Sequence, residues 1–88
     1  MDIYLTRHSK RRAKLYKISI EDILAIINKY DLSSYPLDSV INIIDSEYIE
    51  KYKYPIKIVL KKELLKLIIF TVFPYKGKKD ESSLRQGN

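Results

Sequence analysis

The sequence predicts an α+β fold: a short N-terminal strand, two helices, and then a three- to four-stranded antiparallel sheet. Two observations favour this class. Helical patterns occupy the first third of the chain, and β-branched runs separated by turn residues occupy much of the rest. Helices followed by strands in this order are typical of α+β proteins. A chain of 88 residues has room for one core, so we expect a single domain over residues 1–79 and a disordered polar tail at 80–88.

The first 31 residues predict one strand and two helices. Residues 2–6 alternate polar and apolar side chains, which is the pattern of a short strand. Thr6 is a suitable N-cap for a helix over residues 7–16, which has little apolar surface and should lie on the outside of the domain. Ser19 and Asp22 resemble a capping box, and apolar residues follow at helical spacing to about residue 31.

The remainder of the chain predicts three strands, which cover residues 40–44, 56–60 and 65–73. Residues 61–64 suit a hairpin turn, and Pro74 should end the last strand because proline cannot donate to a sheet. Residues 46–54 fit a helical turn, a loop or an irregular strand. The apolar residues that we expect in the core are Ile23, Leu24, Ile27, Ile58, Leu67, Ile69 and Val72.

The composition argues against several kinds of site. The chain has no cysteine and one histidine, so we expect no disulfide, no metal and no other cofactor. The longest apolar run, over residues 67–73, is too short to cross a bilayer, and the N-terminus lacks a signal-peptide pattern. These features predict a cytoplasmic protein that does not engage a membrane. The wealth of Ile, Lys and Tyr without Cys or Trp is compatible with a thermophilic source.

Charge is segregated along the chain, whose net charge is +6. Residues 7–17 carry six basic side chains and no acid, whereas residues 18–50 carry seven acids against Lys29 alone. Residues 51–79 carry nine lysines against Glu63. If the fold brings the two basic blocks together, they form one positive face that suits a polyanion. The alternative is that the lysines simply solvate edge strands.

The first basic block holds the only histidine. On a helix, His8, Arg11, Arg12 and Leu15 share one face, because residues three and four apart are neighbours. A histidine can take or give a proton near neutral pH, and a guanidinium can hold a phosphate through two hydrogen bonds. This combination suits metal-independent RNA cleavage, and it equally suits phosphate binding without chemistry. A third alternative is that His8 only packs at the start of a helix.

A set of short motifs resembles one group of small domains. The matching residues are Thr6-x-His8, Arg12 four residues later, Ile18-Ser19 at a helix start, and the final strand Phe70-Thr71-Val72-Phe73-Pro74. These domains resemble the RelE/ParE and BrnT toxins, whose ribonucleases share a small fold of a helix pair and an antiparallel sheet. The resemblance covers about residues 3–79 and implies a RelE-like fold and roles for His8, Arg12 and Thr71. The chain departs from the pattern at Tyr16 and Lys17, where the family has arginine and glycine.

The segment after the last strand adds further candidates. Tyr75 follows the final strand and could act beside His8 and Arg12 as a third catalytic group. The alternative is that residues 75–79 form a solvated basic tail that only adds electrostatic affinity. Tyr48, Tyr52 and Tyr54 lie among lysines and could stack single-stranded bases. The alternative is that Tyr52 and Tyr54 point to one face of a strand and complete a core edge. The candidate nucleic-acid-binding residues are the cations around these positions: Arg7, Lys10, Arg11, Lys14, Lys76, Lys78 and Lys79.

The sequence therefore favours an RNA-engaging, RelE/BrnT-like domain, and the leading hypothesis is a toxin-type ribonuclease that needs no metal. The alternative is a non-catalytic module that binds nucleic acid or protein through a basic face. The expected partners are RNA or another nucleic acid, an acidic antitoxin-like protein, or a second copy in a homodimer.

Overall fold

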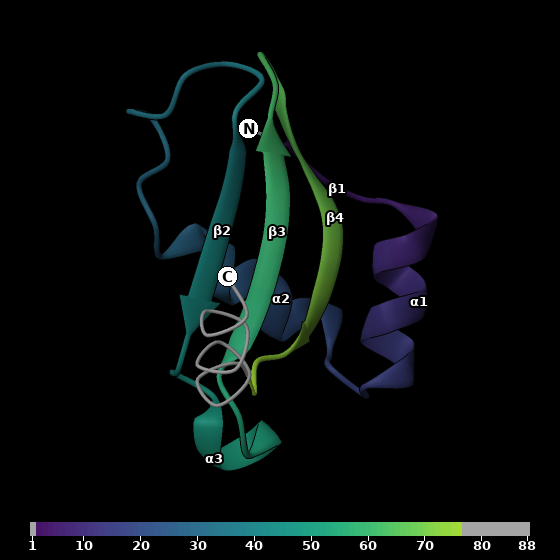
Figure 1. Ribbon diagram of the computed structural model, residues 1–88. Coiled ribbons are helices and arrows are strands. Elements are labelled where there is room, and N and C mark those ends of the chain that lie inside the picture. Colours follow the sequence, from purple (N-terminus) through teal and green to yellow (C-terminus); the bar gives the residue numbers. More distant parts are fainter. Residues whose placement is uncertain (1, 77–88) are drawn as a thin grey trace, which may run out of the picture.

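The computed structural model describes residues 2–76, which form a four-stranded sheet with a helix on one face and another at one edge (Figure 1). The candidate residues Lys78 and Lys79 and the tail at 80–88 lie outside the described residues. In chain order the elements are β1 (Asp2–Leu5), α1 (Arg7–Leu15), α2 (Ile20–Asn28), β2 (Val40–Asp45), α3 (Ile49–Tyr52), β3 (Ile56–Lys62) and β4 (Lys66–Pro74).

The strand order in the sheet is β1-β4-β3-β2, which confirms the predicted α+β layout. β2, β3 and β4 are antiparallel neighbours, as expected. β1 pairs with β4 in parallel, with Leu5 opposite Ile69, so the sheet is mixed and not wholly antiparallel. A parallel pair needs a long connection, and here the helices and two strands lie between its members.

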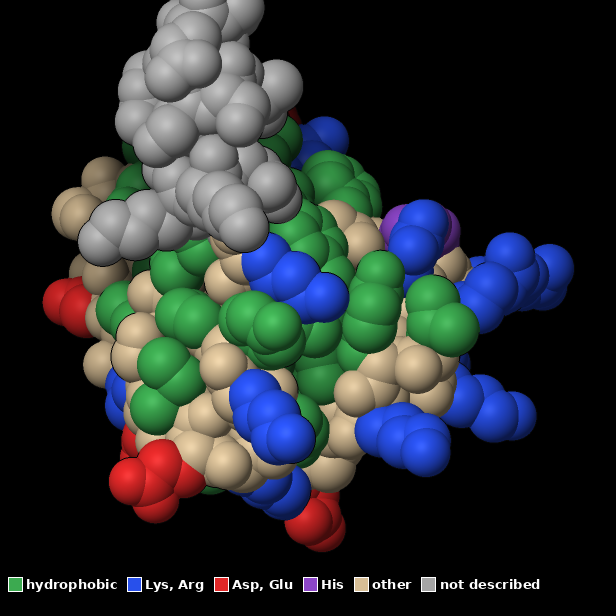
Figure 2. All heavy atoms as spheres, turned by 60° about the horizontal axis from the view of Figure 1, so that its bottom comes forward, with side chains coloured by type: hydrophobic (Ala, Val, Ile, Leu, Met, Phe, Trp, Pro, Cys, Tyr) green, Lys and Arg blue, Asp and Glu red, His purple; other side chains and the backbone are tan. Residues whose placement is uncertain are grey.

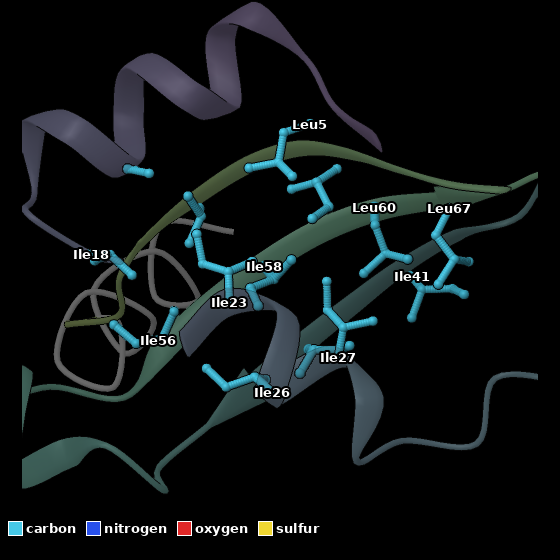
Figure 3. Packing of buried hydrophobic residues seen from close by; sticks show 14 residues of the cluster. Leu5, Ile18, Ile23, Ile26, Ile27, Ile41, Ile56, Ile58, Leu60 and Leu67 are labelled. Atoms are coloured by element: carbon cyan, nitrogen blue, oxygen red, sulfur yellow. The ribbon is translucent and has the colours of Figure 1, made fainter. Parts of the chain in front are cut away.

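The core lies between α2 and the sheet, where α2 and all four strands contribute apolar side chains (Figure 3). β3 alternates strictly, and its residues 56, 58 and 60 are fully buried against α2. Ser19 caps α2 by accepting a hydrogen bond from the Asp22 N–H over 3.1 Å, as the capping box predicts. Six of the seven predicted core residues are buried, and the exception, Leu24, is half-buried near the rim of α2.

A β-bulge in β4 shifts the alternation of buried and exposed side chains by one residue. Leu60 pairs with Ile69 and Val59 pairs with Thr71, so Phe70 is the extra residue on β4. Because of this insertion, Ile69 and Val72 are three residues apart and yet both are fully buried. Phe70 itself remains exposed. The bulge also lies next to the start of α1.

Lys62 is a buried cation that holds the loop between α2 and β2. Its ammonium group donates to the carbonyl oxygens of Leu32, Ser33 and Tyr35 over 2.9, 3.0 and 2.7 Å. The alternation of β3 places position 62 on the core face, where only a side chain with these partners can carry a charge. All three N–H donors of the ammonium are therefore satisfied by backbone.

Changing Lys62 to Met should destabilise the domain by about 2–4 kcal/mol, because three loop carbonyls then lose a charged donor. Lys61→Met is the matched control, since the neighbouring side chain lies on the opposite face of β3. The control should stay within about 0.5 kcal/mol of the wild type. Urea unfolding measures both, and equal stability of the two variants would show that the Lys62 contacts contribute little.

A candidate nucleic-acid interface on helix α1

Thr6 fixes the start of α1 against the bulge in β4. Its hydroxyl oxygen accepts the Ser9 N–H over 3.1 Å, which is the predicted N-cap. The same hydroxyl donates toward the carbonyl oxygens of Ile69 and Phe70, at 3.1 and 3.3 Å. The buried Ser9 hydroxyl donates back to the Thr6 carbonyl over 2.8 Å. These contacts hold the first turn of α1 at one place on the sheet.

α1 lies along the second half of β4, where β1 no longer pairs with it (Figure 1). Only Ser9 and Ala13 of the helix are buried, so one narrow side faces the sheet and the rest faces solvent. This confirms the prediction of an outer helix. The helix ends at Leu15, one residue before the predicted end, and Leu15 is exposed.

The solvent side of α1 is densely basic. Arg7, Lys10, Arg11 and Lys14 are exposed, and Arg12 is half-buried. Figure 2 shows blue side chains gathered at the side of the molecule that carries the purple histidine. The helix contains no acid, and within residues 2–76 none of its cations takes part in an ion pair. This surface therefore presents positive charge that the described part of the chain does not neutralise.

Several acids of residues 18–50 pair with lysines away from α1. Buried Asp45 pairs with the Lys29 ammonium at 2.5 Å and accepts the Tyr30 hydroxyl over 2.7 Å. Burial alone would raise the pKa of Asp45, but these two partners and the Glu47 N–H outweigh burial and lower it. At neutral pH the carboxylate is charged and already paired, so it does not offset the charge of α1.

A second paired carboxylate, that of Asp22, connects α3 to α2. Asp22 lies 2.8 Å from the Lys51 ammonium and accepts the Tyr52 hydroxyl over 2.5 Å. The hydrogen bond from Lys51, followed by that from Tyr52, lowers the pKa of Asp22. The Tyr52 oxygen also accepts the Ser19 N–H, and the Tyr52 ring packs edge-on against Tyr48. Tyr52 thus packs at the edge of the core, as its structural alternative predicted, but from helix α3 and together with Tyr48. Tyr54, which was expected beside Tyr52 on a strand, is exposed instead.

His8 and Arg12 are brought together, as the helical spacing predicts. The Nε–H of Arg12 points at His8 Nε2 over 3.4 Å, and the imidazole is exposed. The contact requires an Nε2 that carries no proton. An imidazole lone pair and a guanidinium therefore share one exposed point on the first two turns of α1.

Tyr75 is not placed beside this pair. The start of α1 is anchored at Phe70, and β4 continues for four residues beyond it; Tyr75 is the fifth, about 17 Å farther along an extended chain. There the Tyr75 N–H donates to the Pro55 carbonyl over 2.7 Å, and the Lys57 ammonium lies 5.5 Å from the Tyr75 ring centre. The candidate catalytic group of three is thus a pair, His8 and Arg12, with Tyr75 near the other end of β4.

The second basic block does not join α1 as a whole. Lys51 and Lys62 are used inside the domain, and Lys76 lies 4.9 Å from the Tyr54 ring centre. Lys57 and Lys66 lie on the sheet face away from α2. The sequence shows the lysines but not their partners, because every one of these contacts joins distant segments.

Within residues 2–76 there is no cluster of three or more potential metal-ligating side chains. None of the helices in this part of the chain is long and apolar enough to span a membrane. No protein-family model, curated protein or solved structure matches the chain. The RelE/BrnT resemblance therefore depends on the motif residues themselves.

Proposed function

We propose that this protein is a cytoplasmic RNA-binding domain that holds the phosphate backbone on the exposed side of α1. The single observation that carries the proposal is the set of solvent-facing cations on α1, which have neither an acid in the helix nor an ion pair within residues 2–76. Clustered cations on one helix are the electrostatic footprint of nucleic-acid binding. The likeness of Thr6, His8 and Arg12 to the RelE/BrnT motif supports RNA as the target.

The paired His8 and Arg12 support a second candidate function, metal-independent RNA cleavage at the same surface. In such a reaction a base removes the 2′-OH proton, and that oxygen attacks the phosphorus while the 5′-oxygen leaves. His8 Nε2 is an exposed base for the first step, and Arg12 is within reach of a phosphate bound there. The guanidinium must move from the imidazole to the phosphate before the base is available. Tyr75 is too far along β4 to protonate the 5′-oxygen, so that proton would come from solvent.

Binding of RNA should weaken steeply as salt increases. Each phosphate neutralised by α1 releases condensed counterions, so log K falls linearly with log salt concentration. With about four to five contacts to single-stranded RNA, affinity should fall about 50- to 150-fold between about 50 and 200 mM salt. Fluorescence anisotropy with a labelled RNA measures this slope. Affinity that does not depend on salt, or no binding in dilute buffer, would count against the proposal.

An acidic protein would also fit the basic surface of α1. The resemblance to toxins implies a partner of this kind, similar to an antitoxin. The same titration separates the two occupants. RNA binding in the absence of any partner supports the nucleic-acid function. A surface that binds no RNA and retains only an acidic protein would assign α1 to protein recognition.

A further inference from the structure

The face of the sheet opposite α2 is not covered by any helix of the described chain (Figure 1). Side chains alternate along each strand, so the neighbours of the buried residues lie on this face. We call it the open face, and its residues include Tyr4, Lys57, Lys66, Ile68, Phe70 and Phe73.

The open face carries exposed aromatic rings next to one another. Tyr4 in β1 is 55% exposed and Phe70 in β4 is 37% exposed, although both strands are paired within the sheet. Tyr4 pairs in parallel with Ile68, two residues before Phe70, so strand spacing and rise place Tyr4 and Phe70 about 8 Å apart. Phe73 follows about 10 Å farther along β4. The three rings therefore form a row along β4.

Lysines accompany these rings. The Lys66 ammonium lies 5.8 Å from the Tyr4 ring centre, and the Lys57 ammonium lies 6.0 Å from the Phe73 ring centre. Neither lysine forms an ion pair with any residue in the described range 2–76. A surface of flat apolar groups interleaved with cations is complementary to a polyanion that carries flat apolar groups of its own. An uncharged apolar partner would leave the lysines without counter-charges.

The open face is continuous with the basic surface of α1. The Thr6 hydroxyl, which caps α1, lies 3.3 Å from the carbonyl oxygen of Phe70 at the bulge. Arg7 follows Thr6 directly, so the first cation of the helix and the Phe70 ring start from adjoining backbone. A chain whose phosphates lie on α1 can therefore place its bases on the row of rings.

We infer that the open face stacks the bases of single-stranded RNA while α1 holds its phosphates. This inference depends on the proposed RNA-binding function and narrows its substrate class. A double helix keeps its bases stacked on one another and offers no free base faces to the rings, whereas a single strand does. The protein should thus prefer single-stranded RNA over a duplex of the same length.

The test compares a labelled oligouridine of about 12 nucleotides with an RNA duplex of the same length at equal salt. The variant Tyr4→Leu/Phe70→Leu removes two rings and keeps the positions apolar. Its affinity for oligouridine should fall by at least about tenfold, with the duplex affinity and the salt slope unchanged. The control Tyr35→Leu removes an equally exposed ring from the loop between α2 and β2 and should change neither affinity.

The outcomes distinguish this inference from the proposed function. Salt-dependent binding of both RNAs with no effect of the ring variant would overturn base stacking and leave phosphate binding by α1 intact. Equal loss of single-strand and duplex affinity in the ring variant would also overturn it, since a general loss indicates a disturbed fold. Failure of the wild type to bind either RNA would overturn the proposed function and this inference together.

Discussion

Changing Arg11 and Arg12 together to glutamate will abolish RNA binding at physiological salt. Both residues lie on α1, and neither forms an ion pair within residues 2–76 that the change would break. The double reversal removes two phosphate contacts and adds two repulsions, so affinity should fall by about 100-fold or more. Loss of two contacts should also lower the salt slope by about 1.4 for single-stranded RNA. Anisotropy titrations at several salt concentrations measure both quantities.

Two double variants with the same net charge distinguish direct phosphate contacts by α1 from the effect of the protein's overall charge. Arg11→Gln/Arg12→Gln and Ser34→Asp/Leu37→Asp each lower the net charge by two. The second pair places its acids in the exposed loop between α2 and β2, away from α1. Only the α1 pair should weaken binding substantially and reduce the salt slope. If both pairs weaken binding equally, net charge and not the α1 surface determines affinity.

The variant His8→Ala separates an enzyme from a binding module. If His8 is the base in RNA cleavage, the wild type should cleave RNA in the presence of EDTA. His8→Ala should then reduce the rate by about 10²–10⁴-fold, which is the usual contribution of general acid–base catalysis. RNA affinity should change little, because the phosphates are held by the cations of α1.

Two further variants of α1 serve as controls for that assay. Arg12→Ala should reduce both affinity and rate, since the guanidinium can hold the bound phosphate and stabilise the transition state. Lys14→Ala should reduce affinity and leave the cleavage rate of bound RNA unchanged. Activity that survives in His8→Ala would make His8 structural. A wild type that cleaves no RNA, with or without ribosomes, would leave phosphate binding as the function of the His8–Arg12 pair.

Local signals made much of the fold predictable. The N-caps Thr6 and Ser19, the alternation of β3 and the stop at Pro74 each depend on a few neighbouring residues, and all of them agree with the structure. The parallel pairing of β1 was not predictable, because nothing within residues 2–6 records the direction of a partner far along the chain. α3 was ambiguous for the same reason, since Tyr52 is held by Asp22 and Ser19 from a distant helix.

The candidate site was predictable only in part. His8 and Arg12 were placed together correctly because helical spacing is a local property. Tyr75 could not be placed, since its separation from His8 depends on where α1 meets β4. The bulge at Phe70 could not be predicted, because residues 67–73 are almost all apolar and no residue type marks the extra position. The bulge leaves the Phe70 ring exposed beside α1. The role of Lys62 was hidden because its partners are backbone carbonyls.

An amide chemical-shift titration of the whole chain with short single-stranded RNA maps the surface that contacts the nucleic acid. The largest shifts should fall on residues 7–15 of α1 and extend across the bulge to Phe70. Residues of the loop between α2 and β2 should remain unchanged. Saturable shifts that cluster on that loop or on α3, with residues 7–15 unaffected, would contradict the assignment of α1 as the RNA-binding surface.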